Sequence, residues 1–368
     1  MRGKRMERNI GVKSIVALLL VVVVTAEKVW ADHPSVGVQG LASGPIITST
    51  AGALGANKVA VSVDFQYVSF DAVSNAALTR GAERGEDIHS TNALSRTALN
   101  ATYGVSEKLT VGLSLPYIER QGLRRSAHGH GGHDAEEHHE GGDEDIESAA
   151  ASIIRLGNAE GLGDAQLYGA YQFYAEPGAD RAALLFGVKM PTGNTQQKSR
   201  VGERLETELQ PGSGSWDYFF GLAYSTKYAE WAVDANVMYT LVSEGAQRTR
   251  QGDIFNYNIA FSRPLLGLKH DHRDHMHDHG AYACVSELLS AMSLALVMEI
   301  NGVQRDRVEI AGHVEANSGG NLLYFSPGLR ANVGQWAFNT ALSIPIENLY
   351  GTQSEPETGV HFRASYVF

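Results

Sequence analysis

Two histidine-rich stretches hold the residues of this 368-residue chain that could bind a metal ion. The first, within 126–145, mixes five histidines with Asp and Glu, and the second, within 269–280, intersperses five histidines with Asp. Imidazole and carboxylate ligands together suit Zn, Ni, Cu or Co. The candidate metal ligands are His128, His130, His133, His138, His139, His270, His272, His275, His277 and His279.

Composition alone makes these stretches metal-binding candidates. Glycines separate ligands of the first stretch, so no tetrahedral set is fixed in advance. Met276 and Cys284 could add soft ligands for Cu(I). The alternative is a solvated polar loop with incidental affinity. No cofactor is required in either case.

The elements that must hold these stretches are β-strands, and residues 359–368 show their pattern. Apolar and polar side chains alternate there with period two, which indicates one apolar and one wet face. The apolar set is Val360, Phe362, Ala364, Tyr366 and Phe368. We expect such a strand, ending on Phe368, to face outer-membrane lipid and to engage the barrel-assembly machinery.

The same alternation recurs along the chain and predicts twelve strands. An even count is the rule for bacterial barrels, and most predicted connections alternate between long and short, as outer-membrane barrels require. The prediction is an all-β, transmembrane antiparallel β-barrel of outer-membrane type. The strands are expected at 58–70, 96–105, 109–117, 164–174, 181–190, 216–227, 231–241, 254–263, 292–301, 322–333, 336–346 and 359–368.

Two alternatives accompany this prediction. A soluble antiparallel sandwich also alternates, although it needs no aromatic residues at its strand ends. The connection 264–291 is long where the barrel needs a short periplasmic turn, so either a large turn exists there or a strand pair is missing.

The first 57 residues are expected to lie outside the barrel wall. A basic stretch followed by the apolar run 14–26 predicts a cleaved signal peptide, residues 1–31, and hence export to the outer membrane. Residues 32–57 are expected to form a periplasmic or lumen segment, with the barrel at 58–368. Removing the signal peptide leaves 24 Lys and Arg against 39 Asp and Glu, which disfavours nucleic acid as a partner.

Charged residues in the predicted strands fall on the polar register and therefore face a wet lumen. A basic residue facing lipid at mid-depth would cost about 2–4 kcal/mol. The lumen could pass solutes, or its ions could pair and plug it, because twelve strands give only a modest bore. The predicted lumen-lining residues are Lys58, Asp64, Arg96, Lys189, Asp234, Glu299, Arg330, His361 and Arg363.

Several Gly-rich motifs at strand and loop junctions carry a resemblance to a known family. The motifs are Gly44-Pro45-Ile46, Gly161-Leu162-Gly163-Asp164, Gly187-Val188-Lys189-Met190-Pro191-Thr192-Gly193 and Gly212-Ser213-Gly214-Ser215-Trp216-Asp217. Over most of the mature chain they resemble the outer-membrane transporter-like proteins of the MetA-pathway of phenol degradation family. The resemblance implies an outer-membrane barrel with a transport role and no agreed catalytic residues.

The function expected from these features is a channel for small solutes, with a metal-related role through the histidine-rich loops. One alternative is a non-conducting, metal-binding barrel. A barrel lipid hydrolase is the other, and it needs a serine–histidine pair oriented by a third group. His361 is expected in the lumen and His89 and His313 in loops, so the chain is not expected to be an enzyme.

Overall fold

The computed structural model describes residues 45–83, 88–126, 153–176, 180–266, 292–315, 318–348 and 354–368. Strands dominate these ranges, and within them no helix has the length and apolar character needed to cross a membrane.

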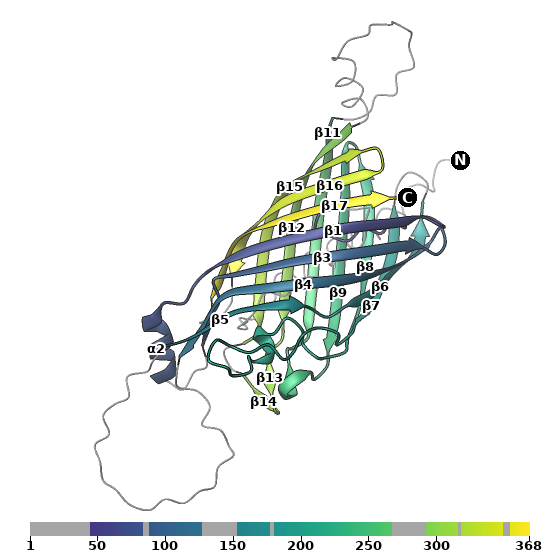
Figure 1. Cartoon of the computed structure of the whole chain (residues 1–368). Helices are drawn as coiled ribbons and strands as arrows, with labels where there is room; N and C mark the ends of the chain where they lie inside the picture. Colours follow the sequence, from purple (N-terminus) through teal and green to yellow (C-terminus); the bar gives the residue numbers. More distant parts are fainter. Residues whose placement is uncertain are drawn as a thin grey trace, which may run out of the picture.

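Twelve strand positions form one closed antiparallel sheet (Figure 1). Strands that are consecutive in sequence are neighbours in the wall. The first strand pairs with the last, and a pairing between the third and fourth strands of the wall completes the ring. In order, the strands are β1 (Val59–Asp71), β3 (Ala93–Gly104), β4 (Leu109–Ser126), β6 (Gln166–Ala175), β7 (Arg181–Lys189), β8 (Asp217–Tyr228), β9 (Trp231–Val242), β11 (Ile254–Leu266), β12 (Met292–Arg305), β15 (Gly320–Val333), β16 (Trp336–Asn348) and β17 (Glu355–Val367).

The remaining elements lie beyond the ends of these strands or extend one of them. Strand β5 (Ile153–Leu162) pairs with the far half of β4 and occupies the same wall position as β6. The others are α2 (Asn75–Glu83), β2 (His89–Ser90), η1 (Thr207–Leu209), η2 (Ala246–Arg248), β10 (Thr249–Arg250), β13 (Glu309–Ile310) and β14 (His313–Val314).

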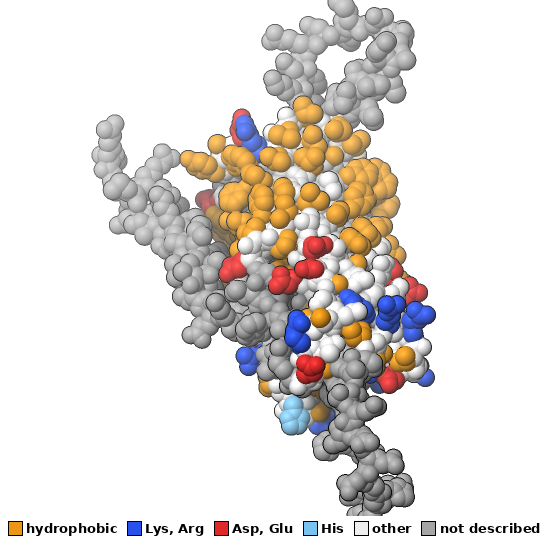
Figure 2. Space-filling view, turned by 90° about the vertical axis from the view of Figure 1, so that its left-hand side faces the viewer, with side chains coloured by type: hydrophobic (Ala, Val, Ile, Leu, Met, Phe, Trp, Pro, Cys, Tyr) orange, Lys and Arg blue, Asp and Glu red, His pale blue; other side chains and the backbone are white. Residues whose placement is uncertain are grey.

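The two faces of the wall differ as period-two alternation demands. Along β1 the outward side chains are apolar and exposed, from Val59 to Tyr67, while the inward Asp64 is buried. Figure 2 shows the result, a broad hydrophobic band with charged side chains gathered beyond it. Because every strand is paired on both sides, the wall leaves no open edge in hydrocarbon. The predicted transmembrane barrel is therefore confirmed.

The two ends of the barrel also differ. At one end the described connections are short, with two residues between β8 and β9 and two between β15 and β16. At the other end the connections 190–216 and 243–253 are long and contain η1, η2 and β10. Long connections outside and short ones in the periplasm are typical of outer-membrane barrels, so we take the short-turn end as periplasmic. Residues 267–291, within the long predicted connection 264–291, lie outside the described ranges.

The predicted strands end at 117 and begin again at 164, and the expectation that 119–163 between them form one polar loop was wrong. Strand β4 continues to Ser126, and β5 returns alongside it from Ile153. The cluster Arg120, Arg124 and Arg125 breaks the apolar alternation, because this part of the wall extends beyond the hydrophobic band. Two register shifts, around Leu123, further obscure the period.

Leu99, midway along the outward face of β3 and 60% exposed, tests the orientation of the wall. We expect Leu99→Arg to destabilise the folded barrel in lipid by about 2–4 kcal/mol, because it places a guanidinium near mid-depth. Tyr103→Arg, on the same face nearer the strand end, should cost about 0–1 kcal/mol. Denaturant titration in lipid vesicles measures both, and equal costs would contradict the proposed orientation.

Candidate functional site

Residues 45–57, here called the lumen segment, run through the inside of the barrel. The segment contacts inward side chains of strands on opposite sides of the wall: β12 through Glu299, β9 through Asn236 and β4 through Thr110. Its sequence is rich in Gly, Ala, Ser and Thr, and small side chains let a chain without regular structure fit within a narrow bore. Residues 32–44 lie outside the described ranges.

The carboxylate of Glu299 holds the start of this segment. Its two oxygens accept hydrogen bonds from three successive backbone amides, those of Ile46 (2.6 Å), Ile47 (3.1 Å) and Thr48 (2.8 Å), and from the Thr48 hydroxyl (2.7 Å). Asn301 Nδ2 donates another at 3.2 Å. Glu299 has no exposed surface, and a buried carboxylate is tolerated only when donors surround it.

Hydrogen bonds to several strands fasten the rest of the segment. The Ser49 amide donates to Asn236 Oδ1 (3.0 Å), and the Ala51 amide donates to Ser225 Oγ (2.8 Å). The Ser225 hydroxyl in turn donates to Asp234 Oδ1 at 2.6 Å. Asp234, a predicted lumen residue, therefore supports the segment through Ser225.

Cavities remain on both sides of the lumen segment. A cavity of about 810 Å³ opens toward the periplasmic strand ends and is lined by Lys58, Asp234 and Arg330. Two smaller ones, of about 170 and 70 Å³, lie on the extracellular side. His361 lines the smallest, and its Nδ1 has no hydrogen-bond partner among the described residues. Lys58 itself is exposed at the rim, where β1 begins.

Two other predicted lumen residues form a buried pair. Asp64 on β1 lies opposite Arg363 on β17, and the guanidinium donates to both carboxylate oxygens, at 2.5 and 3.2 Å. Asn100 Nδ2 donates to the same carboxylate at 3.0 Å. The pair thus links the first and last strands of the wall by a two-pronged contact in addition to the backbone ladder.

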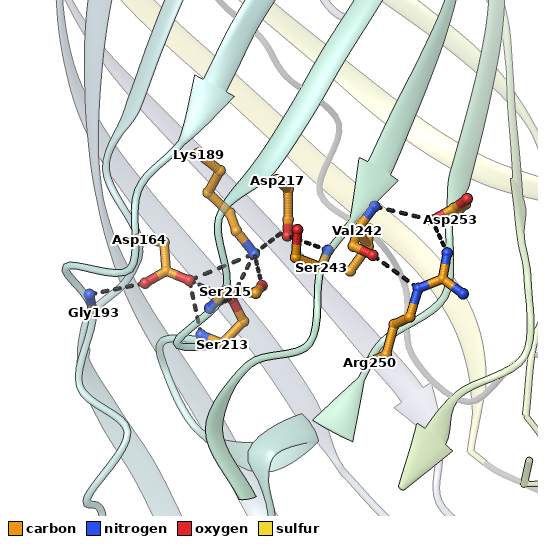
Figure 3. A network of polar contacts seen from close by, with 10 residues as sticks. All are labelled: Asp164, Lys189, Gly193, Ser213, Ser215, Asp217, Val242, Ser243, Arg250 and Asp253. Carbon is orange, nitrogen blue, oxygen red and sulfur yellow. Dashed lines mark hydrogen bonds and ion pairs between the residues drawn. The ribbon is translucent and has the colours of Figure 1, made fainter. Parts of the chain in front are cut away.

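Lys189 stands at the centre of a polar network near the extracellular end (Figure 3). Its ammonium contacts the carboxylate of Asp217 and donates to Ser213 Oγ at 2.5 Å. Asp164 accepts hydrogen bonds from the amides of Gly193 (2.9 Å) and Ser213 (2.8 Å), and lies 3.6 Å from the ammonium. The network ties both ends of the 190–216 connection to the wall.

A close backbone approach explains two glycines of this connection. A Cβ placed on Gly212 would lie 2.6 Å from the carbonyl carbon of Gly193, and one on Gly193 would lie 2.7 Å from Gly212 Cα. No side chain fits at such separations, so both positions need glycine. The motifs that carry the family resemblance therefore have a local role: they turn the connection back against the barrel.

Sequence reasoning missed several residues of the lumen. Arg120 on β4 and Arg305 on β12 line the 170 Å³ cavity, yet both lie beyond the predicted strand ends. Asp164 and Asp217 lie within predicted strands, but the sequence pattern did not identify them as residues that line the lumen. The period-two spacing could have identified Arg120 and Arg305, because both continue the inward-facing alternation of their strands.

The predicted metal ligands, from His128 to His139 and from His270 to His279, lie outside the described residues. Within the described ranges no group of three or more His, Cys, Asp or Glu side chains is placed to hold a metal ion. Of the histidines examined for hydrolase chemistry, His89 is buried 3.0 Å from Glu206, and His313 is exposed on β14.

Comparison with solved structures identifies the fold. The COG4313 outer membrane channel from Pseudomonas putida F1 matches with a TM-score of 0.54 and 15% identity, over 86% of this chain and 98% of that one. The β domain of the Bordetella autotransporter BrkA gives a TM-score of 0.43 at 9% identity, over 84% of this chain and all of that one. No family model and no curated protein matches the sequence. The chain therefore has an outer-membrane β-barrel fold similar to that of the Pseudomonas putida protein.

The Lys189 network predicts the order of the 190–216 connection. Asp164→Ala removes the acceptor for two loop amides, and a donor left without its acceptor costs about 1–3 kcal/mol. We expect trypsin to cut the variant at Lys198, Arg200 or Arg204 while the wild-type barrel resists. Glu230→Ala, which removes only an exposed ion pair with Arg263, is the control. Equal resistance of all three proteins would contradict the assigned role.

Proposed function

We propose that this protein is a narrow outer-membrane channel for small solutes and that its conduction is limited by the lumen segment. The observation that carries the proposal is the Glu299 clamp, which holds the chain inside a wet, charged bore. The fold resemblance to an outer membrane channel supports it, as does a lumen lined by polar and paired ionic groups.

The cavities support a gated passage rather than an open pore. The largest lies on the periplasmic side of the lumen segment and the two small ones on the other side. The Glu299 carboxylate engages three successive amides, whereas the later hydrogen bonds of the segment are spread over several strands. Release of residues 46–48 from Glu299 would connect the cavities, while the amides of Leu54 and Asn57 keep the segment attached to the wall.

We further propose that the chain belongs with the transporter-like proteins of the MetA-pathway of phenol degradation family. The Asp164, Lys189 and Asp217 network gives three of the four quoted motifs a shared structural purpose. The proposal includes export by a cleaved signal peptide, insertion by the barrel-assembly machinery and location in the outer membrane, which the barrel fold and the sequence pattern support. The outward aromatic group Trp336, Tyr366 and Phe368 at the end of the wall fits contact with the lipid interface.

A metal-related role for the histidine-rich stretches is a second part of the proposal, and its support is compositional. Ten histidines interspersed with carboxylates would capture Zn²⁺ or a similar ion near the channel. The non-conducting metal-binding barrel is the competing function.

Glu299→Ala tests the gating proposal in planar bilayers. Without the carboxylate, the amides of Ile46, Ile47 and Thr48 lose their acceptor, and this part of the segment should leave its position against β12. We expect single-channel conductance to rise several-fold relative to wild type. Glu230→Ala should leave it unchanged. Absence of current from every variant would overturn the channel, and equal currents would overturn the role of the segment.

The metal proposal predicts Zn²⁺ binding that depends on the two stretches. Titration calorimetry with zinc chloride should show binding to the wild-type barrel and none after all ten histidines are replaced with glutamine. Replacing His89, His313 and His361 instead should preserve binding. Unchanged binding in the ten-histidine variant would contradict the assignment.

A further inference from the structure

The cavity of about 170 Å³ near the extracellular end has more cationic than anionic side chains in its wall. Four of its lining residues are basic, Arg96, Arg120, Lys189 and Arg305, and three are acidic, Asp164, Glu208 and Asp217. This excess runs against the net charge of the whole chain, which is −11. The balance is therefore a local feature of the cavity.

The carboxylates of this cavity are already engaged. Asp164 accepts from the Ser213 hydroxyl (2.6 Å) as well as from two amides, and Asp217 contacts Lys189 and accepts from the Ser243 amide (3.2 Å). Glu208 and Arg305 also have interactions of their own. The two cations to account for are Arg96 and Arg120.

Arg96 is 4% exposed, yet its guanidinium makes one weak hydrogen bond, from Nη2 to Ser114 Oγ at 3.5 Å. The nearby carboxylate of Asp64 attracts it, but Asp64 is held in a two-pronged contact by Arg363, which repels it. Two guanidinium groups therefore share one carboxylate. A buried cation with such partners keeps much of its desolvation cost.

Arg120, on the neighbouring strand, is half-buried and also has a guanidinium nitrogen without a hydrogen-bond partner among the described residues. This nitrogen, Nη1, is shielded from solvent. Glu208 attracts the guanidinium and Arg305 repels it. Arg120 pairs across from Leu94, two residues from Arg96 on the same lumen face, so the two arginines are diagonal neighbours within reach of one ligand.

Apolar side chains lie beside these two groups on the same two strands, since Leu94 pairs with Arg120 and Ile118 pairs with Arg96. Polar side chains line other parts of the wall, among them Gln166, Gln210 and Asn256. The apolar side chains favour a solute whose body is small and apolar, while a planar guanidinium favours a carboxylate, which it binds through two parallel hydrogen bonds.

We propose that Arg96 and Arg120 form a binding subsite for the carboxylate of a small solute with a short apolar body. The carboxylate of the solute gives the two arginines the negative partner that the engaged carboxylates of the cavity do not provide. The apolar side chains beside the arginines hold the remainder of the solute. The inference rests on the proposed channel function, because it places a selectivity site on the extracellular side of the lumen segment.

Titration calorimetry with sodium butyrate tests the subsite on the whole purified barrel, and butyramide serves as the neutral probe of the same shape. We expect butyrate to bind and butyramide not to. Arg96→Gln and Arg120→Gln should each weaken butyrate binding about tenfold or more, since a hydrogen bond to a charged group contributes about 1.5–3 kcal/mol. Arg181→Gln, in the periplasmic cavity, should bind as wild type does.

Heat-dependent mobility on gels establishes that each variant is folded, and Arg96→Lys, which keeps the charge, should bind more tightly than Arg96→Gln. Equal binding of butyrate and butyramide, or equal loss in Arg181→Gln, would overturn the subsite. Currents in planar bilayers separate the two proposals. Conduction without butyrate binding refutes the subsite alone, whereas butyrate binding without conduction in any variant refutes the channel alone.

Discussion

The contact between Glu299 and the amides of residues 46–48 determines how the inside of this barrel is arranged. A fully buried carboxylate is costly unless donors surround it, and here the chain itself supplies them from about 250 positions away in sequence. One buried side chain on β12 thereby fixes the path of a segment that has no regular structure. The cavities and the proposed route for solutes follow from that path.

The wall makes this arrangement possible because it separates two solvents with one repeating pattern. Closure of β1 against β17 satisfies the backbone in hydrocarbon, and period-two alternation sends the ionic residues inward. Once inside, the charges differ in their partners. Asp64 with Arg363 and Lys189 with Asp217 are pairs that join strands or connections, whereas Arg96 and Arg120 exceed the carboxylates available to them. The first group provides structure, and the second is where recognition of a solute is expected.

The sequence predicted the wall well and its contents poorly, for a physical reason. Strands such as β3 and β9 can be predicted because lipid on one face and water on the other impose alternation. Beyond the lipid this constraint ends, so the sequence pattern predicts a loop where the far half of β4 and all of β5 lie. The lumen segment has no periodicity at all, and its contact with Glu299 depends on long-range geometry. The alternation of its strand predicts that Lys189 faces the lumen. It does not predict which residues contact the ammonium, because these come from other parts of the chain.

The most direct measurement of the central claim is hydrogen exchange at the amides of Ile46, Ile47 and Thr48 in the folded barrel. If these amides donate to a buried carboxylate inside the wall, they should exchange as slowly as amides of the surrounding strands, although they belong to no strand. Exchange at the rate of an unstructured peptide would show that the segment does not occupy the lumen, and the account of a gated channel would fail.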